Sequence, residues 1–121
     1  MEKVYKVGII GCGGISHMHT NWYRVEPRTE VTSISDINAD LLKSYAEQYG
    51  IEKAYTDYIK MLETEDLDIV SVCTRPKFHA PLVIESAKRG VRGILSEKPM
   101  AENLGQAREM VDVSQKNNVK A

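Results

Sequence analysis

The sequence has few of the residues that mark disulfide-rich, metal-binding or nucleic-acid-binding proteins. It contains two cysteines and three histidines in 121 residues, and its 16 Lys and Arg residues are balanced by 17 Asp and Glu residues. Cys12 and Cys73 do not make a disulfide framework, which is typical of a chain in the reducing cytoplasm. A net charge of −1 without a basic cluster argues against a nucleic-acid partner.

Long apolar runs are also missing, and the histidines lack the spacing of metal ligands. The apolar run at residues 4–10 is too short for the core of a signal sequence, and no other segment is long enough to span a membrane. His17 and His19, two positions apart on a predicted helix, point in different directions, and neither an acid nor a cysteine joins them at ligand spacing. We therefore expect no membrane partner and no metal.

What the sequence does have is an alternation of strand and helix patterns over its whole length. Residues 4–10 form a continuous apolar run that ends in glycine, as in a strand buried on both faces. Residues 14–26 predict a helix whose apolar side chains, at spacings of three, four and three, form one face: Ile15, Met18, Trp22 and Val25. Further strands are predicted at 30–35, 53–55, 67–73 and 92–97, and further helices at 57–64, 79–89, 104–114 and from an Asn38 or Asp40 cap to Tyr49.

Strands that alternate with helices predict parallel βαβ units in a single α/β domain. Right-handed crossovers then favour a doubly wound parallel sheet with strand order 3-2-1-4-5. A sixth strand would begin at Val119, so the sheet is predicted to be truncated there. In such sheets ligands bind beyond the carboxyl ends of the strands, which is where the polar motifs of this sequence fall.

The motif GCGGIS, at residues 11–16, lies between the first strand and the first helix. Gly11 permits a tight turn, and Gly13 lets the backbone approach a pyrophosphate closely. The beginning of the helix, at Gly14 and Ile15, supplies free N–H groups and a partial positive charge for that anion. Ser16 replaces the usual third glycine and is small enough to let the helix pack on the strand. The alternative is a glycine-rich turn in a fold that binds another ligand.

Asp36 ends the second predicted strand, 20 residues after Ser16. An acid at this place can hydrogen-bond the ribose hydroxyls of a bound adenosine, although aspartate is also common in ordinary loops. A carboxylate would repel a 2′-phosphate, and no Lys or Arg follows before Lys43. The sequence therefore predicts NAD as the cofactor in preference to NADP.

Two more segments follow the fourth and fifth predicted strands. Cys73, Thr74 and Pro76 lie just past the fourth strand, where they would line the crevice, and His79 is either a site residue or a packing residue of the next helix. Glu97 and Lys98 end the fifth strand at the same edge, in the stretch SEKP. A lysine there can hold the nicotinamide ribose and stabilise negative charge on a substrate oxygen, with Glu97 orienting it. The alternative is a solvated strand end.

In their order and spacing, GCGGIS, Asp36, CT…HA and SEKPMA resemble the glucose–fructose oxidoreductase and inositol dehydrogenase family, often written Gfo/Idh/MocA. The resemblance covers residues 1–121 and implies an NAD(P)-binding Rossmann domain of an oxidoreductase acting on sugars, cyclitols or related alcohols. By that similarity Lys98 is the catalytic residue of this chain, contacting both the nicotinamide ribose and the substrate hydroxyl. The family also carries a C-terminal substrate domain, with further acid–base residues, which is absent from this chain.

Two other functions stay open from the sequence. One is a non-enzymatic NAD-binding or redox-sensing module, for which Glu97 and Lys98 would be expendable. The other is a Rossmann enzyme of another class, such as a methyltransferase, which has no need for Glu-Lys-Pro after the fifth strand. We also expect exposed apolar surface where the second domain would sit, which leaves a homo-oligomer open.

Overall fold

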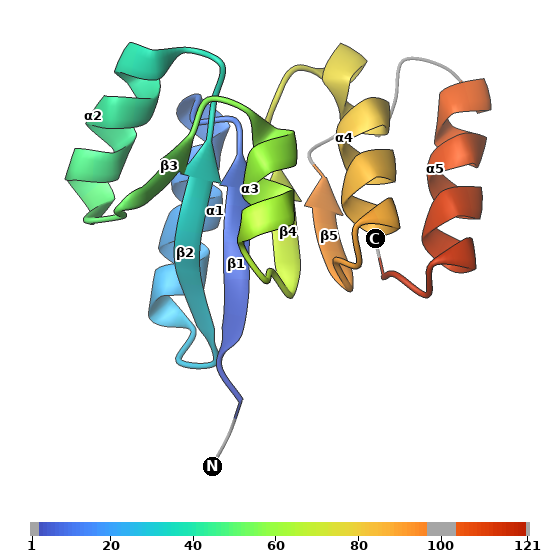
Figure 1. Cartoon of the computed structure of the whole chain (residues 1–121), viewed down its shortest axis with the longest axis horizontal. Coiled ribbons are helices and arrows are strands. Elements are labelled where there is room, and N and C mark those ends of the chain that lie inside the picture. Colours follow the sequence, from blue (N-terminus) through green and yellow to red (C-terminus); the bar gives the residue numbers. More distant parts are fainter. Residues whose placement is uncertain (1–2, 97–103, 121) are drawn as a thin grey trace.

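The computed structural model describes residues 3–96 and 104–120, which form a five-stranded parallel sheet between two layers of helices (Figure 1). The strands are β1 (Tyr5–Ile10), β2 (Thr29–Ser35), β3 (Lys53–Tyr55), β4 (Ile69–Val72) and β5 (Gly93–Ser96). Their spatial order is β3-β2-β1-β4-β5, and all neighbouring pairs are parallel. The predicted doubly wound α/β sheet and its strand order are confirmed.

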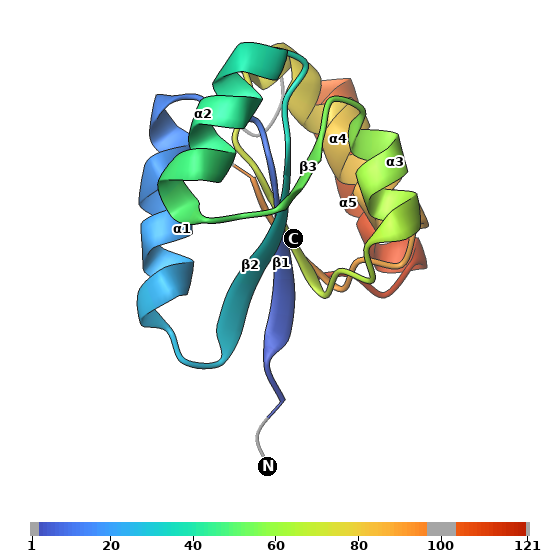
Figure 2. The ribbon, with the colours of Figure 1, turned by 60° about the vertical axis from the view of Figure 1, so that its left-hand side comes forward.

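The helices are distributed over the two faces of the sheet according to the direction of the crossovers. They are α1 (Gly14–Val25), α2 (Ala39–Tyr49), α3 (Tyr58–Thr64), α4 (Pro76–Lys88) and α5 (Leu104–Lys116). Figure 2 shows α1 and α2 on one side of the sheet and α3, α4 and α5 on the other. Right-handed connections that run from β1 outward to β3 place helices on one face, whereas those that run from β4 to β5 place them on the opposite face.

Side-chain caps and a left-handed glycine fix the ends of α2 and α3. The Asn38 side chain accepts a hydrogen bond from the Leu41 N–H at 3.1 Å, so Asn38 is the cap of α2. Gly50 ends α2 with φ 67°, a conformation that glycine adopts without steric cost. Asp57 caps α3 in the same way, through the Ile59 N–H at 2.9 Å.

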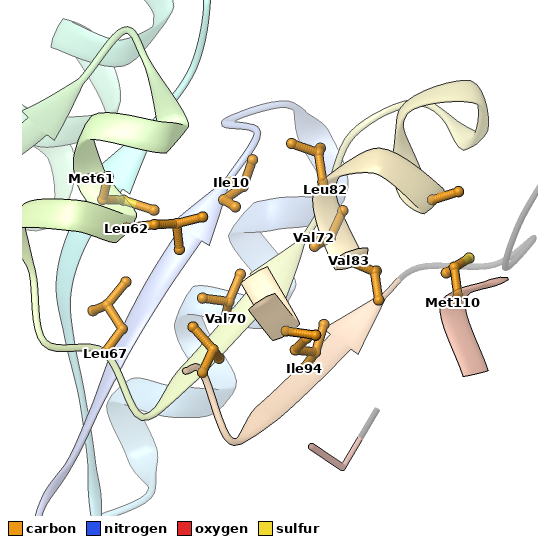
Figure 3. Close-up of a cluster of buried hydrophobic side chains, with 13 residues drawn as sticks. Ile10, Met61, Leu62, Leu67, Val70, Val72, Leu82, Val83, Ile94 and Met110 are labelled. Atoms are coloured by element: carbon orange, nitrogen blue, oxygen red, sulfur yellow. The ribbon is translucent and has the colours of Figure 1, made fainter. Parts of the chain in front are cut away.

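Two hydrophobic clusters, one on each face, hold the helices to the sheet. The larger one lies between α3, α4, α5 and the sheet and includes Met61, Val70 and Val83, each at most 1% exposed (Figure 3). The other lies under α1 and α2 and includes Ile9, Ile34 and Tyr45. The central strand β1 contributes to both clusters, as its continuous apolar run predicts.

The predicted helix α1 forms, but its apolar face does not point to the core. Its four apolar residues are 39% (Ile15), 42% (Met18), 53% (Trp22) and 81% (Val25) exposed. Its buried residues are instead the polar Ser16, His19 and Thr20. Small hydroxyl side chains let α1 lie close to the sheet. The Thr20 hydroxyl finds its partner on the neighbouring helix α2, where the Tyr45 hydroxyl lies 2.6 Å from Thr20 Oγ1.

Several element boundaries differ from the sequence prediction. Helix α4 begins at Pro76 instead of residue 79, because proline is well tolerated in the first turn, where its missing N–H would have no helical partner. The fourth strand is shorter than predicted, Ile69–Val72 instead of 67–73, and the fifth comprises Gly93–Ser96. Lys120 makes a parallel bridge with Gly93, at the position predicted for a sixth strand.

Candidate dinucleotide site

A cleft of about 720 Å³ opens at the carboxyl edge of the sheet, beyond the ends of β1, β2 and β4. The strand order reverses between β1 and β4, which is the place where open α/β sheets bind ligands. Five of the predicted cofactor residues belong to the described wall of this cleft: Gly11, Gly13, Asp36, Cys73 and Thr74. The tertiary structure therefore brings three separate sequence motifs to one site.

The fold itself requires glycine at position 11, independently of any ligand. Its φ is 95°, and its N–H donates to the Ser35 carbonyl at 2.8 Å, which continues the pairing of β1 with β2. A Cβ at this position would lie 2.9 Å from Thr74 Cγ2 and 3.0 Å from the backbone of Cys73. Only glycine satisfies both this conformation and this close approach, so Gly11 sets the turn that leads from β1 into the site.

Gly13 has a different reason to be glycine. Among the described residues no atom lies within 4 Å of a Cβ built at Gly13, although the residue lines the cleft. Gly13 is also the N-cap residue of α1, and no side chain of the described residues caps it. The exposed Gly14 and Ile15 form the first turn. The uncapped helix start, with its N–H groups and partial positive charge, fits a pyrophosphate that approaches the backbone at Gly13.

Asp36 connects two parts of the site wall. Its Oδ2 accepts a hydrogen bond from the Cys12 N–H at 2.8 Å, and its Oδ1 accepts one from the Asn38 N–H at 2.8 Å. These bonds hold the carboxylate at the mouth of the cleft and fasten the glycine loop to the start of α2. Each carboxylate oxygen keeps a further lone pair, so ribose hydroxyls can still donate to it.

Ser16 and His79 are buried next to the cleft and do not belong to its described wall. The Ser16 hydroxyl donates to the Gly13 carbonyl at 2.5 Å, from beneath the glycine loop. The His79 side chain is 0% exposed, and its Nε2 lies 2.7 Å from the Thr74 carbonyl oxygen. Both residues contact the loops that form the site, and Pro76 begins the helix that follows one of them.

Both cysteines, Cys12 and Cys73, are buried. Burial, with the nearby negative charge of Asp36 as a second cause, raises the pKa of Cys12 to about 12. The thiol therefore stays protonated at neutral pH, and its Sγ lies 3.6 Å from the Ser35 carbonyl oxygen. This environment disfavours the thiolate form of Cys12.

The sequence reasoning missed the apolar part of the cleft wall. Ile37, Leu41 and Phe78 all line the cleft and are 89%, 38% and 42% exposed, respectively. Ile37 directly follows Asp36, and Phe78 is the only phenylalanine of the chain, within the motif after β4. The sequence did contain a signal for this wall, because apolar side chains follow the carboxyl ends of two strands. Such apolar side chains at a ligand site favour binding of a planar ring system.

Glu97 and Lys98 lie outside the described residues, so their predicted roles stay predictions. Within residues 3–96 and 104–120, no group of three His, Cys, Asp or Glu side chains is placed to hold a metal ion. No helix in this part of the chain has both the length and the apolar character needed to cross a membrane.

The fold and the cleft define a dinucleotide-binding Rossmann domain. Comparison with known proteins shows the particular family: residues 5–121 match the model of an oxidoreductase family with an NAD-binding Rossmann fold, GFO_IDH_MocA. The chain belongs to the Gfo/Idh/MocA oxidoreductase family, and the resemblance found in the sequence is confirmed.

Among the relatives is the myo-inositol 2-dehydrogenase of Thermotoga maritima, 32% identical over 114 residues, which are 94% of this chain and 34% of that protein. The WlbA dehydrogenase of Bordetella pertussis, solved with NADH and UDP-GlcNAcA, superimposes with a TM-score of 0.92 at 27% identity, covering 97% of this chain and 36% of that one. A 3-ketoreductase variant of Actinomadura kijaniata, solved with TDP-benzene and NADP, gives 0.87 at 29% identity, covering 97% and 37%. The chain thus spans about a third of the length of these relatives.

Proposed function

We propose that this chain binds NAD in the cleft, with the pyrophosphate over Gly13 and the first turn of α1. The observation that carries the proposal is that three features meet in one cleft. These are the uncapped start of α1, the open space over Gly13, and the Asp36 carboxylate held by the Cys12 N–H. Gly13, Gly14 and Ile15 would hold the pyrophosphate, and Asp36 the adenosine ribose. Thr74 and Cys73 would line the middle of the cofactor, on the loop that His79 and Pro76 support.

The apolar wall of the cleft accounts for the adenine. Ile37 follows the end of β2 and Phe78 lies in the first turn of α4, so two separate elements contribute apolar side chains to one cleft. Covering exposed apolar side chains with a flat aromatic ring removes apolar surface from water, which favours binding of the ring. A nucleotide base is the part of NAD that matches this surface.

The preference for NAD over NADP rests on Asp36, because relatives in this family bind either cofactor: one was solved with NADH and another with NADP. Two backbone N–H groups hold the Asp36 carboxylate in place through hydrogen bonds of 2.8 Å, so the carboxylate cannot move away from a 2′-phosphate that it repels. Neither Ile37 nor Asn38 supplies a compensating positive charge. We therefore expect tighter binding of NAD(H).

In a longer protein of this family, the cleft would supply the cofactor for hydride transfer to or from a sugar, a cyclitol or a related alcohol. Bound NAD supplies the hydride acceptor. Lys98 would stabilise negative charge on the substrate oxygen, oriented by Glu97, while acid–base residues of a C-terminal domain would complete the site. Small-molecule substrates of this class, a cytoplasmic location and a homo-oligomeric assembly belong to the same proposal.

The test is a calorimetric titration of the 121-residue chain with NAD and NADP. We expect weak but saturable NAD binding, and weaker NADP binding. Gly13→Val, which fills the space over the helix start, should weaken NAD binding about tenfold or more without unfolding the chain. The matched control is Gly105→Ala, in α5, which contributes no residue to the described wall of the cleft. A folded chain that binds no dinucleotide would defeat the proposal.

A further inference from the structure

The described wall of the cleft contains one basic side chain, that of Arg75, which follows β4. The only acid among these lining residues is Asp36, and the others are apolar or uncharged. Arg75 is exposed and forms no ion pair with another residue in the described part of the chain, in contrast to Arg28 and Arg89. A guanidinium that lines a cleft without an ion-pair partner is available to an anionic ligand.

The backbone that carries Arg75 is fixed on both sides. Before it, His79 Nε2 lies 2.7 Å from the Thr74 carbonyl oxygen. After it, the Phe78 N–H donates to the Arg75 carbonyl at 3.0 Å. Pro76 restricts the preceding residue to extended conformations, and the φ of −66° and ψ of 152° at Arg75 agree with this. The fold therefore fixes the base of the side chain, while the guanidinium does not cap α4 and stays exposed.

The glycine loop lies between Asp36 and Arg75. The strand order places β1 between β2 and β4 (Figure 1), so the loop after β1 is flanked by Asp36 after β2 and by Arg75 after β4. The β4 loop comes close to the glycine loop, because a Cβ added to Gly11 would lie 2.9 Å from Thr74 Cγ2. Neighbouring strands are about 4.8 Å apart. A group bound over the glycine loop is thus one strand from Arg75, whereas a ribose bound at Asp36 is two strands away.

The glycine loop itself offers a diphosphate no full positive charge. Residues 11–16 contain no basic side chain, and His17, the next residue of α1, contacts the Tyr49 hydroxyl through Nδ1. The start of a helix carries only about half a positive charge. A diphosphate carries more negative charge than this, and the Asp36 carboxylate adds to it. Among the described residues of the cleft wall, Arg75 is the one that can balance this charge.

We propose that Arg75 binds the diphosphate of the cofactor from the β4 side, while the glycine loop and the start of α1 bind it from the other side. A guanidinium can donate two parallel hydrogen bonds to phosphate oxygens, so it suits this group better than a base or a ribose. The inference rests on the proposed binding of NAD. It names the source of positive charge that the glycine loop does not supply.

The experiment compares ADP with adenosine, two ligands that differ only in the diphosphate, on the 121-residue chain. NMR titrations at low and high salt give the dissociation constants for the unaltered chain, Arg75→Gln and Arg75→Lys. Arg75→Gln removes the charge, and Arg75→Lys keeps it. The matched control is Arg108→Gln, which removes an exposed arginine of α5 outside the described wall of the cleft. Thermal unfolding verifies that each variant folds, which the exposure of both arginines favours.

We expect Arg75→Gln to weaken ADP binding about 3- to 10-fold, the range of one charge-assisted hydrogen bond at an exposed site, and adenosine binding less than about twofold. Arg75→Lys should lose less ADP affinity than Arg75→Gln. High salt should weaken ADP binding more in the unaltered chain than in Arg75→Gln, because the variant has one charged contact fewer to screen. Arg108→Gln should leave both constants unchanged.

Unchanged ADP binding in folded Arg75→Gln would overturn the inference. Equal weakening of ADP and adenosine would also overturn it, since the guanidinium would then contact the adenosine. Titration with NADP covers the remaining alternative, because a larger loss for NADP than for NAD would place Arg75 at the 2′-phosphate and contradict the proposal. Failure of the proposed function has a different appearance: the unaltered chain would bind neither ADP nor adenosine, and the role of Arg75 would be refuted with it.

Discussion

The carboxylate of Asp36 accepts a hydrogen bond from the backbone N–H of Cys12 at 2.8 Å, so the acid that ends β2 is fastened to a loop 24 residues earlier in the chain. A residue predicted only as a ribose ligand therefore also shapes the glycine loop. Loss of its side chain should affect both stability and cofactor choice.

Replacement of Asp36 separates these two effects. Asp36→Ala removes the acceptor of two backbone N–H groups and should lower the free energy of unfolding by about 1–3 kcal/mol. It should also narrow the gap between NAD and NADP affinities by removing the repulsion of the 2′-phosphate. Urea unfolding and calorimetry measure the two effects, with the exposed Asp66→Ala as the control. Equal affinities for NAD and NADP in the unaltered chain would contradict the assignment of Asp36.

Gly11 and Gly90 form a matched pair for the steric role of the glycine loop. Both have positive φ, 95° and 88°, but only Gly11 has backbone atoms within 3.0 Å of an added Cβ, whereas the described surroundings of Gly90 leave that space open. Gly90→Ala should therefore cost about 1 kcal/mol for the backbone conformation alone. Gly11→Ala should cost about 3 kcal/mol or more, because the Cys73 backbone must also move. Similar midpoints of urea unfolding for Gly11→Ala and Gly90→Ala would show that the added Cβ at position 11 does not press on the Cys73 backbone.

The raised pKa of Cys12 predicts a loss of stability at alkaline pH. The pKa of the thiol is 9.0 in an unfolded chain and about 12 in the folded one. Between these values the unfolded state releases a proton that the folded state keeps, so folding becomes less favourable as the pH rises, by up to about 1.4 kcal/mol per pH unit. Below pH 9 the contribution is fully present.

Urea unfolding of the unaltered chain and of Cys12→Ala at pH 8, 9 and 10 tests this prediction. Tyr23 and Tyr58 also have raised pKa values, and the comparison of the two proteins cancels their contribution, since Cys12 is not among the causes of either shift. The difference in stability between the two proteins should shrink from pH 9 to pH 10. A constant difference would mean that Cys12 ionises as readily in the folded state as in the unfolded one.

Lys98 distinguishes an oxidoreductase from an NAD-binding module. In the longest natural form of the protein, Lys98→Ala should lower kcat for a sugar or cyclitol substrate about 100-fold or more, with a smaller effect on NAD affinity. Lys116→Ala, at the end of α5, is the control for loss of a lysine charge. A protein that binds NAD normally and loses no activity without Lys98 would favour the sensing role.

Residues 1–121 alone should show no hydride transfer, because the proposed acid–base residues belong to a second domain. A spectrophotometric assay at 340 nm against a panel of sugars and inositols measures this. Robust turnover by the 121-residue chain would refute the two-domain interpretation, and NAD binding without turnover would support it.

The sequence by itself determined the order of elements, and it placed the motifs of the candidate site at one edge of the sheet. The apolar run of β1, the alternation of strands and helices and the crossover rule were enough for the strand order β3-β2-β1-β4-β5. The positions of GCGGIS and Asp36 at strand ends were enough to place them at one edge of the sheet. These features depend on local periodicity and on chain direction, which a sequence displays directly.

Only the tertiary structure decided which side of each element is buried and what the polar residues contact. The spacing of Ile15, Met18, Trp22 and Val25 predicted a helix, yet the sheet lies against the opposite side, where Ser16 and Thr20 fit closely. Local periodicity defines the sides of a helix, but the choice between them depends on the shape and hydrogen-bonding groups of neighbours far away in the chain. The bond from Cys12 to Asp36 exists only once β2 has paired with β1, and the contact of Thr20 with Tyr45 only once α2 has packed beside α1, so both are such long-range choices.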